Sequence, residues 1–239
     1  MSNEQILHPF FQDLYWKIKE KNFLIDKSNA KLVEIMVPRL VLNPENPVLN
    51  FGNKKTAVKY CEKEIQWYLS QDLSIKNWVD DIKIWNDVAS NDKQKLINSN
   101  YGWCIFSKKN YNQYKNCIEE LKSNSYSRRA YMIYIRPSMW EDYNKNGMND
   151  FICTIGVQIF IRNNSLIYII NQRSLDIWYS LIGADFYWHS YVYNKIYSEL
   201  LSTYSNLKKN KIIWIPNSMH LYEVHFDAFV DLFENFYEK

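Results

Sequence analysis

Apolar positions spaced three and four residues apart predict several amphipathic helices. Near the amino terminus, Leu7, Phe11 and Leu14 would lie on one side of such a helix, with polar residues on the other. The same spacing along the chain predicts helices at residues 4–22, 54–70, 110–122, 185–202 and 223–236. We expect these helices to bury their apolar sides against a β-sheet.

Alternating apolar residues and β-branched runs predict the strands. In KLVEIMVPRLVL (31–42), apolar and polar positions alternate, and Pro38 predicts an edge or a bulge within the strand. The segments AYMIYIRP (130–137) and KIIWIP (211–216) are rich in β-branched and aromatic residues, which favour strands. All three segments are therefore predicted strands.

The segment GVQIFIRNNSLIYIINQRS (156–174) predicts a β-hairpin. Its two strands meet at Asn163 and Asn164, and asparagine tolerates the left-handed conformations that tight hairpin turns require. Strands and helices follow one another without a regular βαβ alternation, which argues against a doubly wound parallel sheet. The sequence therefore predicts an α+β fold, with a mainly antiparallel or mixed sheet packed against helices.

Nothing in the composition divides the chain into parts. Its 239 residues are 47% hydrophobic, which is enough for one full core. Glycine and proline number only 5 and 6, and no Ser/Gly-rich or Pro-rich stretch could form a flexible linker. A single domain over residues 1–239 is the simplest interpretation.

Charge and hydropathy favour a protein without a nucleic-acid or membrane partner. The net charge of +3 comes from scattered Lys and Arg residues, whereas direct nucleic-acid binding usually needs a basic patch. The amino terminus MSNEQILHPFFQD is not a signal peptide, and no apolar run approaches the roughly 18 residues of a membrane span. We therefore expect a cytoplasmic protein.

The four cysteines predict neither a metal site nor a disulfide framework. Cys61, Cys104, Cys117 and Cys153 are irregularly spaced, with no CxxC pair and no histidine at ligand spacing. Reduced thiols and no metal are the expectation.

Taken singly, the candidate functional residues have ordinary structural explanations. Cys153 lies between Ile152 and Ile155, where an inert buried cysteine is the common outcome. Surface charge, a helix N-cap or a satisfied histidine would equally account for the other candidates, which are Glu64, Asp185, His220, Arg128 and Arg129.

Six short motifs in a fixed order are more specific than any single residue. They are EIQWYL, KIW, NSNYGW, SRR, a cysteine twenty residues before the arginine of QRSLD, and HLY. In this order the chain resembles the thymidylate synthase family over nearly its whole length. Within that family it is most similar to the bacteriophage deoxycytidylate hydroxymethylases, through INSNYGW, SRRAYMIYIRPSM to DYNKNGMNDFICT, and IIW followed by SMHLY.

The resemblance implies a nucleophilic mechanism at a pyrimidine ring. Carbon 5 of cytosine is a poor nucleophile, and a thiolate from Cys153 added to carbon 6 would make it reactive towards 5,10-methylenetetrahydrofolate. Arg173, on the neighbouring strand of the hairpin, would favour the ionised thiol. Glu64 matches the family glutamate that organises water or acts as a general base. The expected product is 5-hydroxymethyl-dCMP, made by addition of water.

Two positions separate the chain from thymidylate synthase itself. Thr154 follows the nucleophile where the synthase has His, and Asp185 stands where the synthase has the Asn that reads uracil. A carboxylate accepts from the amino group of cytosine, and when it shares a proton it also donates to the ring nitrogen. Asp185 therefore favours dCMP over dUMP.

The remaining roles are carried over from the family, position by position. The resemblance implies a mixed sheet at the interface of a homodimer, in which Arg173 and Ser174 bind the phosphate with Arg128 and Arg129 of the partner protomer. It implies further roles for Lys27 at the phosphate, for His220 and Tyr222 at the ribose, for Tyr101 beside the nucleophile, and for Trp85 and Asp176 at the folate. If a phage encodes the protein, its location would be the host cytoplasm.

Several alternatives stay open on the sequence alone. A dUMP hydroxymethylase, a CMP hydroxymethylase or a divergent thymidylate synthase would share the same motifs. An inactive family member that only binds nucleotides is the alternative of another class. The chain ends at FENFYEK, shorter than the family's folate-closing tail, which motivates this last alternative. Retention of Cys153, Glu64 and the arginines speaks against it.

Overall fold

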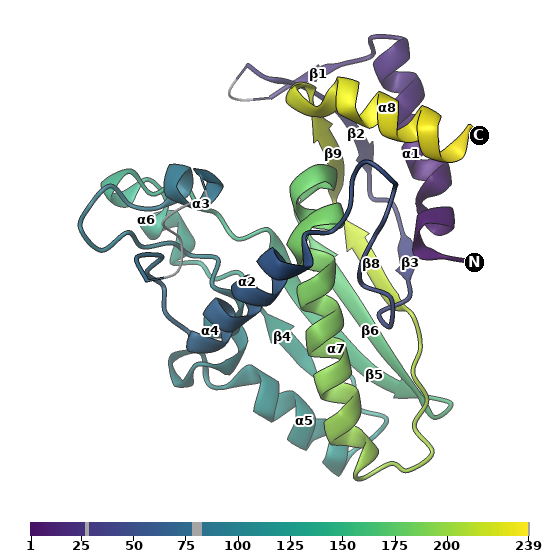
Figure 1. Ribbon diagram of the computed structural model, residues 1–239. Helices are drawn as coiled ribbons and strands as arrows, with labels where there is room; N and C mark the ends of the chain where they lie inside the picture. Colours follow the sequence, from purple (N-terminus) through teal and green to yellow (C-terminus); the bar gives the residue numbers. More distant parts are fainter. Residues whose placement is uncertain (27–28, 78–82, 239) are drawn as a thin grey trace.

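The structure, a computed structural model, describes residues 1–26, 29–77 and 83–238, and combines helices with two β-sheets (Figure 1). The helices are α1 (Asn3–Lys19), α2 (Val58–Ser70), α3 (Lys83–Val88), α4 (Tyr101–Phe106), α5 (Gln113–Ser123), α6 (Met139–Asp142), α7 (Asp185–Leu201) and α8 (Phe226–Tyr237). Short turns of other helical types are η1 (Lys108–Asn110), η2 (Lys145–Gly147), η3 (Ile177–Ala184) and η4 (Glu223–His225). The strands are β1 (Leu24–Ile25), β2 (Lys31–Met36), β3 (Leu40–Leu42), β4 (Tyr131–Ile133), β5 (Thr154–Arg162), β6 (Ser165–Gln172), β7 (Leu175–Asp176), β8 (Ile212–Pro216) and β9 (Ser218–Tyr222).

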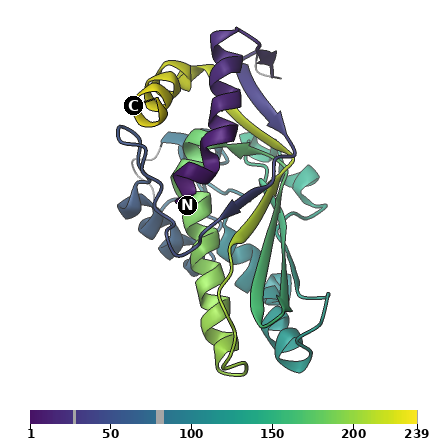
Figure 2. The same cartoon turned by 90° about the vertical axis from the view of Figure 1, so that its right-hand side faces the viewer.

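The larger sheet has the strand order β3-β8-β6-β5-β4. Strands β6 and β8 run parallel and the other neighbours antiparallel, so the sheet is mixed, as predicted. Asn163 and Asn164 both have positive φ angles, of 50° and 57°, which confirms the predicted hairpin turn between β5 and β6. Helix α7 lies along one face of this sheet (Figure 2).

Alternation along the strands explains that packing. In β6, the buried side chains Leu166, Tyr168 and Ile170 alternate with half-buried ones, and β8 buries Ile212 and Trp214 in the same way. Helix α7 contributes fully buried residues to the same core, including Phe186, Val192 and Ile196. Burial of this apolar surface is the main force that holds α7 on the sheet.

The smaller sheet has the order β1-β2-β9-β7 and corrects one prediction. Residues 31–42 were expected to form one strand, but β2 pairs with β9 in this sheet and β3 pairs with β8 in the other. The chain turns at Val37, whose φ is 49° and whose N–H donates to Asn217 O at 3.0 Å. Pro38 follows this turn and has no N–H to offer a ladder, which explains the break.

The helix predictions hold for most of their lengths. Helix α1 begins with a capping box between Ser2 and Gln5, and it packs on α8 through contacts such as Tyr15 with Phe233. Helix α2 begins at Val58 instead of residue 54, because the preceding residues form a β-bridge between Asn50 and Lys55. Helices α3, α4 and α6 were not predicted. Among the described residues, no helix is long and apolar enough to cross a bilayer.

Candidate active site

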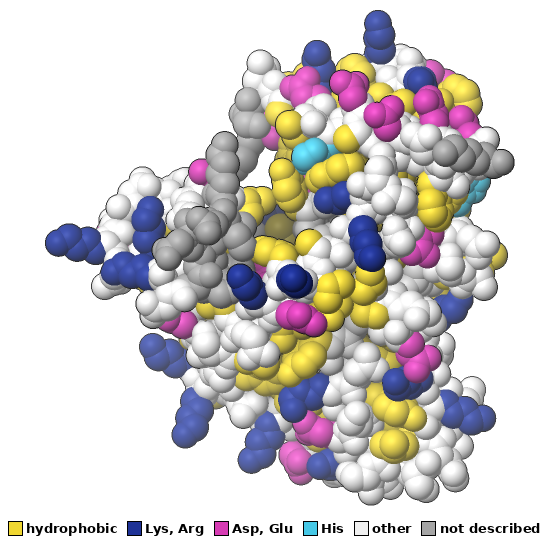
Figure 3. Space-filling view, in the orientation of Figure 1, with side chains coloured by type: hydrophobic (Ala, Val, Ile, Leu, Met, Phe, Trp, Pro, Cys, Tyr) yellow, Lys and Arg dark blue, Asp and Glu magenta, His cyan; other side chains and the backbone are white. Residues whose placement is uncertain are grey.

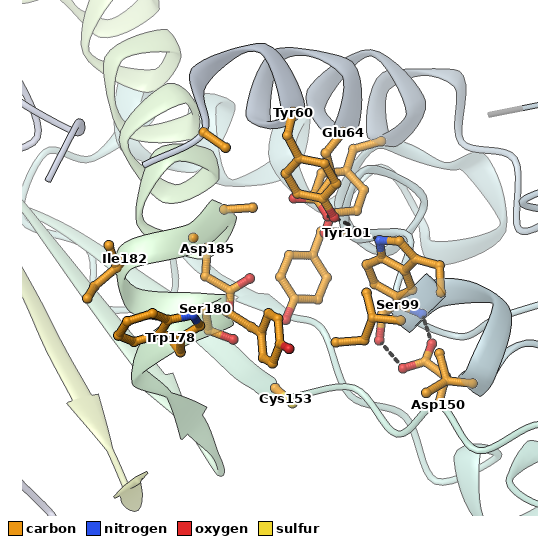
Figure 4. Close-up of a pocket in the computed structure, with 18 of the residues that line it drawn as sticks. Tyr60, Glu64, Ser99, Tyr101, Asp150, Cys153, Trp178, Ser180, Ile182 and Asp185 are labelled. Atoms are coloured by element: carbon orange, nitrogen blue, oxygen red, sulfur yellow. Dashed lines mark hydrogen bonds between the residues drawn. The ribbon is translucent and has the colours of Figure 1, made fainter. Parts of the chain in front are cut away.

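A cavity of about 400 Å³ opens between α2, α3, α4 and the η3–α7 junction. On the face shown in Figure 3, apolar side chains line a hollow and Lys and Arg side chains lie around it. Most of the cavity wall is apolar or aromatic, with a few polar groups converging on it (Figure 4). This combination is typical of a small-molecule site. Its lining includes five of the predicted residues, which are Cys153, Glu64, Asp185, Tyr101 and Trp85.

Cys153 is the residue immediately before β5, and its side chain lines the cavity. The backbone N–H of Arg173 donates to Cys153 O at 2.9 Å, so the hairpin holds these two residues side by side, as predicted. Arg173 Nη2 lies 3.7 Å from Cys153 Sγ and 2.6 Å from Phe151 O, and Nε donates to Ile152 O at 3.0 Å. Three contacts therefore fix the guanidinium beside the thiol.

The charge of Arg173 does not by itself ionise the thiol. Cys153 keeps part of its side chain exposed to the cavity, yet the surrounding protein raises the pKa of the thiol to about 12. Burial is the largest cause, and the guanidinium of Arg173 lowers the pKa against it. The predicted influence of Arg173 has the right direction, but the thiol of the free protein is neutral at pH 7. Further positive charge beside the sulfur would favour its ionisation.

Glu64 lies on the inner side of α2 and is only 3% exposed. Tyr60, one helical turn earlier, donates to Glu64 Oε1 at 2.8 Å, and Trp85 Nε1 donates to Tyr60 OH at 2.9 Å. Burial raises the pKa of the Glu64 carboxyl to about 8, while the bonds from Tyr60 and Trp85 lower it. Near neutral pH this carboxyl can therefore both accept and return a proton.

Glu64→Gln should stabilise the free protein at alkaline pH and remove its activity. Between the ordinary glutamate pKa and about 8, the folded state holds a proton that the unfolded state has lost, so native stability falls as pH rises through this window. Glutamine keeps the acceptor for Tyr60 and cannot ionise. The variant's advantage in free energy of unfolding should grow from near zero at pH 4.5 to a few kcal/mol at pH 8, at roughly 1.4 kcal/mol per pH unit.

Urea unfolding of both proteins across this pH range measures the effect. Glu62→Gln is the matched control, because Glu62 is exposed on the same helix. It should show no comparable growth of stability with pH. A constant difference between Glu64→Gln and the native protein would mean that Glu64 is not the buried, proton-holding carboxyl described above.

Asp185 is the first residue of α7, and two successive hydrogen bonds between side chains link it to the larger sheet and orient it. Trp214 Nε1 donates to Gln172 Oε1 at 2.9 Å, which leaves the amide N–H₂ of Gln172 to donate to Asp185 Oδ2 at 3.1 Å. Because the indole can only donate, the orientation of the Gln172 amide is fixed. Burial raises the pKa of Asp185 to about 6, against the bonds from Gln172 and Ser180. The carboxyl is thus able to share a proton near neutral pH.

The predicted ribose residues lie in the smaller sheet next to one predicted folate residue, Asp176, whereas the other, Trp85, lies on α3. His220 and Tyr222 point to one side of β9, with ring centroids 5.2 Å apart. Asp176 pairs with His220 across β7 and β9. The Asp176 Oδ1 atom accepts from Trp178 N and Tyr179 N, each at 2.7 Å, and so caps η3. These residues border the η3 segment that forms part of the cavity wall.

The structure brings only some of the predicted phosphate-binding residues together. Ser174 follows Arg173 directly and lies half-buried between β6 and β7. Arg128 and Arg129 are exposed before β4 and do not line the cavity of their own chain; Arg129 pairs with Glu120 at 2.9 Å. Lys27 lies outside the described residues.

Several residues of the site were missed from the sequence. Tyr60 and Glu64 stand at i and i+4, a spacing that allows contact along one helix. Gln172 adjoins Arg173 but had no pattern to distinguish it. Gly102 is also required, because a Cβ there would lie 1.8 Å from Tyr68 O. Because Gly102 has no Cβ, α4 can approach α2 closely.

The comparisons with known proteins agree with this geometry. The family model described as thymidylate synthase matches residues 25–235. A deoxycytidylate 5-hydroxymethyltransferase of Enterobacteria phage T4 is 42% identical over 212 residues, which cover 87% of this chain and 83% of the relative. The chain belongs to the thymidylate synthase family. The resemblance noted in the sequence and the α+β fold that it implied are both confirmed.

Two branches of the thymidylate synthase family match this member to different extents. The deoxycytidylate 5-hydroxymethyltransferase of Enterobacteria phage T6 is 41% identical over 87% of the chain and 83% of its own length. A thymidylate synthase of Francisella tularensis subsp. holarctica is 25% identical over 73% of the chain and 65% of its own length. Similarity is thus stronger and longer to the hydroxymethyltransferases.

Proposed function

We propose that this family member transfers a one-carbon unit to carbon 5 of dCMP and adds water, giving 5-hydroxymethyl-dCMP. The observation that carries the proposal is that the thiol of Cys153 and the carboxyl groups of Asp185 and Glu64 line the same cavity. The 42% identity to the deoxycytidylate 5-hydroxymethyltransferase of phage T4 supports the same choice of substrate and reaction.

Cys153 begins the reaction by forming a bond to carbon 6 of the pyrimidine. The thiol must lose its proton first, and the guanidinium of Arg173, which lowers the pKa of the thiol, favours that step. Addition at carbon 6 makes carbon 5 enamine-like and able to attack an electrophilic carbon. 5,10-Methylenetetrahydrofolate supplies that one-carbon unit when bound, as the family uses it. Loss of the carbon 5 proton, with cleavage of the bond to the folate nitrogen and departure of tetrahydrofolate, then leaves an exocyclic methylene on the nucleotide.

The cavity suits a planar co-substrate beside the pyrimidine. Trp85 and Trp178 border it together with Ile84, Val88 and Ile182, so flat aromatic surfaces face apolar ones. Lys54 lies 4.5 Å from the centre of the Trp178 ring and also lines the cavity. A pteridine ring can stack on such surfaces while a carboxylate tail meets the lysine.

Asp185 provides the preference for cytosine. The fixed amide of Gln172 occupies one carboxylate oxygen, and the carboxyl shares a proton near neutral pH because its pKa is raised to about 6. Cytosine offers an amino donor and a ring nitrogen acceptor to such a group, whereas uracil offers a carbonyl that meets the carboxylate oxygen. The mismatched base leaves buried polar groups unpaired, which disfavours its binding.

A homodimer completes the site in this proposal. Alternate residues of the larger sheet point away from α7, and five of them are apolar and half-buried, namely Phe160, Ile167, Ile169, Ile213 and Ile215. An apolar sheet face of this kind is suited to packing against a second copy. Arg128 and Arg129, exposed before β4, would then reach the phosphate site of the partner.

A mixing experiment tests this sharing of arginines. The double variant Arg128→Ala/Arg129→Ala and the variant Cys153→Ser should each be inactive alone. Mixed dimers hold one complete site, with the thiol from one protomer and the arginines from the other, so random reassortment should restore about a quarter of native activity. Recovery is measured as hydroxymethyl-dCMP formed after the subunits have been exchanged.

The control pair is Lys108→Ala/Lys109→Ala, which removes two exposed positive charges from η1 and should stay active. Absence of recovery in mixed dimers that are shown to form would contradict arginine sharing. Full activity of the double arginine variant alone would contradict any phosphate role for the pair.

Product analysis distinguishes the proposed reaction from hydroxymethylation of dUMP or CMP and from thymidylate synthesis. Tritium at carbon 5 should be released from dCMP much faster than from dUMP or CMP. No absorbance rise from dihydrofolate should accompany the reaction, because a hydroxymethyltransferase does not oxidise the folate. Faster release from dUMP together with that absorbance rise would identify a thymidylate synthase instead.

A further inference from the structure

Ser99 and Asp150 form a buried polar pair in the cavity wall that the mechanism above does not use. Ser99 is 6% exposed and Asp150 is 8% exposed, and both line the cavity. The Ser99 hydroxyl donates to Asp150 Oδ1 at 2.7 Å, as the dashed line in Figure 4 marks. Burying such a pair costs free energy unless each polar group has a hydrogen-bond partner. The hydrogen bonds within the pair therefore determine which atoms can still bind a ligand.

The hydrogen bonds of Asp150 fix the direction of the Ser99 hydroxyl. Asp150 Oδ2 accepts from the backbone N–H groups of Asn98 at 2.7 Å and of Ser99 at 2.6 Å. Oδ1 is therefore left for the Ser99 hydroxyl hydrogen. With its hydrogen directed at Asp150, Ser99 Oγ has only lone pairs to offer to the cavity. A hydroxyl held in this way accepts hydrogen bonds, and water is the natural donor.

One member of the pair, Asp150, stands close to the nucleophile along the chain. Asp150 precedes Cys153 by three residues, and Ser99 precedes Tyr101 by two. All four residues line the same cavity. In Figure 4, Ser99 and Asp150 lie across the cavity from Trp178 and Ile182. Glu64 and Asp185 receive hydrogen bonds from Tyr60 and Gln172, respectively, whereas the Ser99 hydroxyl donates to Asp150.

We propose that Ser99 binds the water that adds to the exocyclic methylene of the nucleotide, and that Asp150 positions Ser99 for this by taking its hydroxyl hydrogen. The inference rests on the proposed hydroxymethyltransferase function and deepens it, because it names the group that delivers the second substrate of the reaction. Ser99 contacts the reacting water, whereas Asp150 acts through Ser99.

The step balances without any further reactant. The water oxygen bonds to the methylene carbon, the π electrons of the exocyclic double bond move into the ring, and the bond between carbon 6 and Cys153 Sγ breaks. The water proton passes to Ser99 as Ser99 gives its own hydrogen to the Asp150 carboxylate. Burial raises the pKa of Asp150, which assists this transfer, although Arg173 lowers it. The proton then returns to the Cys153 thiolate released from carbon 6, which restores the neutral thiol.

Ser99→Ala separates this step from the earlier ones. Without positioned water, the methylene returns its carbon to folate, and carbon 5 recovers a proton from solvent, so tritium is lost without product. Hydroxymethyl-dCMP formation should fall about tenfold to 100-fold, while tritium release from carbon 5 falls less than about threefold. The ratio of tritium released to product formed should rise from about one to well above five. Both are measured on the same sample of intact protein.

Asp150→Asn is the second variant and acts by reorienting the hydroxyl. The two backbone N–H groups require the amide oxygen, so the amide nitrogen faces Ser99 and donates to it. Ser99 Oγ then turns its hydrogen towards the cavity, and the ratio should again rise. The matched control is Ser90→Ala, because Ser90 is buried and donates to Asp92 Oδ1 at 2.9 Å without lining the cavity. Its ratio should stay near one.

A parallel loss of tritium release and product in Ser99→Ala, with the ratio unchanged, would overturn the proposal and leave the pair as a structural link. Unchanged product formation would overturn it as well. If the native protein itself releases tritium but forms no hydroxymethyl-dCMP, the proposed function fails, and the inference falls with it. The native ratio thus distinguishes the two failures.

Discussion

Replacing Cys153 with serine is expected to abolish turnover while leaving dCMP binding nearly intact. A serine hydroxyl is far less nucleophilic than a thiolate, and Arg173 contacts the side chain without needing sulfur for its other bonds. We expect a loss of about 10⁴-fold or more in kcat, as is usual when a covalent nucleophile is removed. The dissociation constant for dCMP should change by less than about tenfold, because the thiol is neutral in the free protein.

The matched control is Cys117→Ala, which removes a thiol buried on α5 and away from the cavity. It should cost stability and keep turnover. A 5-fluoro-dCMP probe adds a direct readout, because fluorine at carbon 5 cannot leave as a cation and the covalent complex persists. Intact mass should show the adduct in native protein and in the control. Undiminished turnover in Cys153→Ser would rule out the proposed nucleophile.

Asp185→Asn should reverse the choice of base. Asparagine cannot supply the shared proton that pairs with the ring nitrogen of cytosine, but its amide can both donate to and accept from uracil. Two buried contacts change sign, each worth about 1 to 3 kcal/mol. The ratio of kcat/KM for dCMP over dUMP should therefore fall by about 10² to 10⁴. Steady-state tritium release with each nucleotide measures it.

Asp176→Asn controls for general damage to the η3 segment. Asparagine is also a good helix cap, so the bonds to Trp178 N and Tyr179 N can persist. Folate affinity should change and base preference should not. If Asp185→Asn lowers kcat/KM equally for both nucleotides, Asp185 supports the fold of the site and does not read the base.

The hairpin shows why part of the site could be predicted from the sequence. Asn163 and Asn164 determine the turn between β5 and β6, and regular pairing outward from that turn would bring Cys153 opposite Ser174. A register shift between Thr154 and Gly156 moves its neighbour to Arg173. His220 and Tyr222 were likewise predictable, because alternate residues of a strand share a face. Local rules of spacing thus give the nucleophile and its neighbours.

Other features depend on contacts that no local pattern encodes. The orientation of Asp185 comes from Gln172 and Trp214, which lie on different strands and meet it only after folding. The neutrality of the Cys153 thiol also arises from tertiary burial, which outweighs the charge of Arg173. Sequence spacing predicted that Arg173 would lie beside Cys153, but not the protonation of the thiol.

The same distinction applies to the pair of Ser99 and Asp150. They lie far apart in the sequence, and the motif NSNYGW drew attention to Tyr101 instead of Ser99. Their hydrogen bond forms because the segment before Cys153 packs on the loop that begins α4. Folding therefore adds a polar group to the site that motif matching overlooks.

The central claim is that water supplies the hydroxyl group of the product. Native protein should be incubated with dCMP and 5,10-methylenetetrahydrofolate in water labelled with heavy oxygen, and the nucleotide analysed by mass spectrometry. The account predicts hydroxymethyl-dCMP that carries one heavy oxygen atom, with tetrahydrofolate as the second product. A methylated nucleotide without the label, accompanied by dihydrofolate, would contradict it.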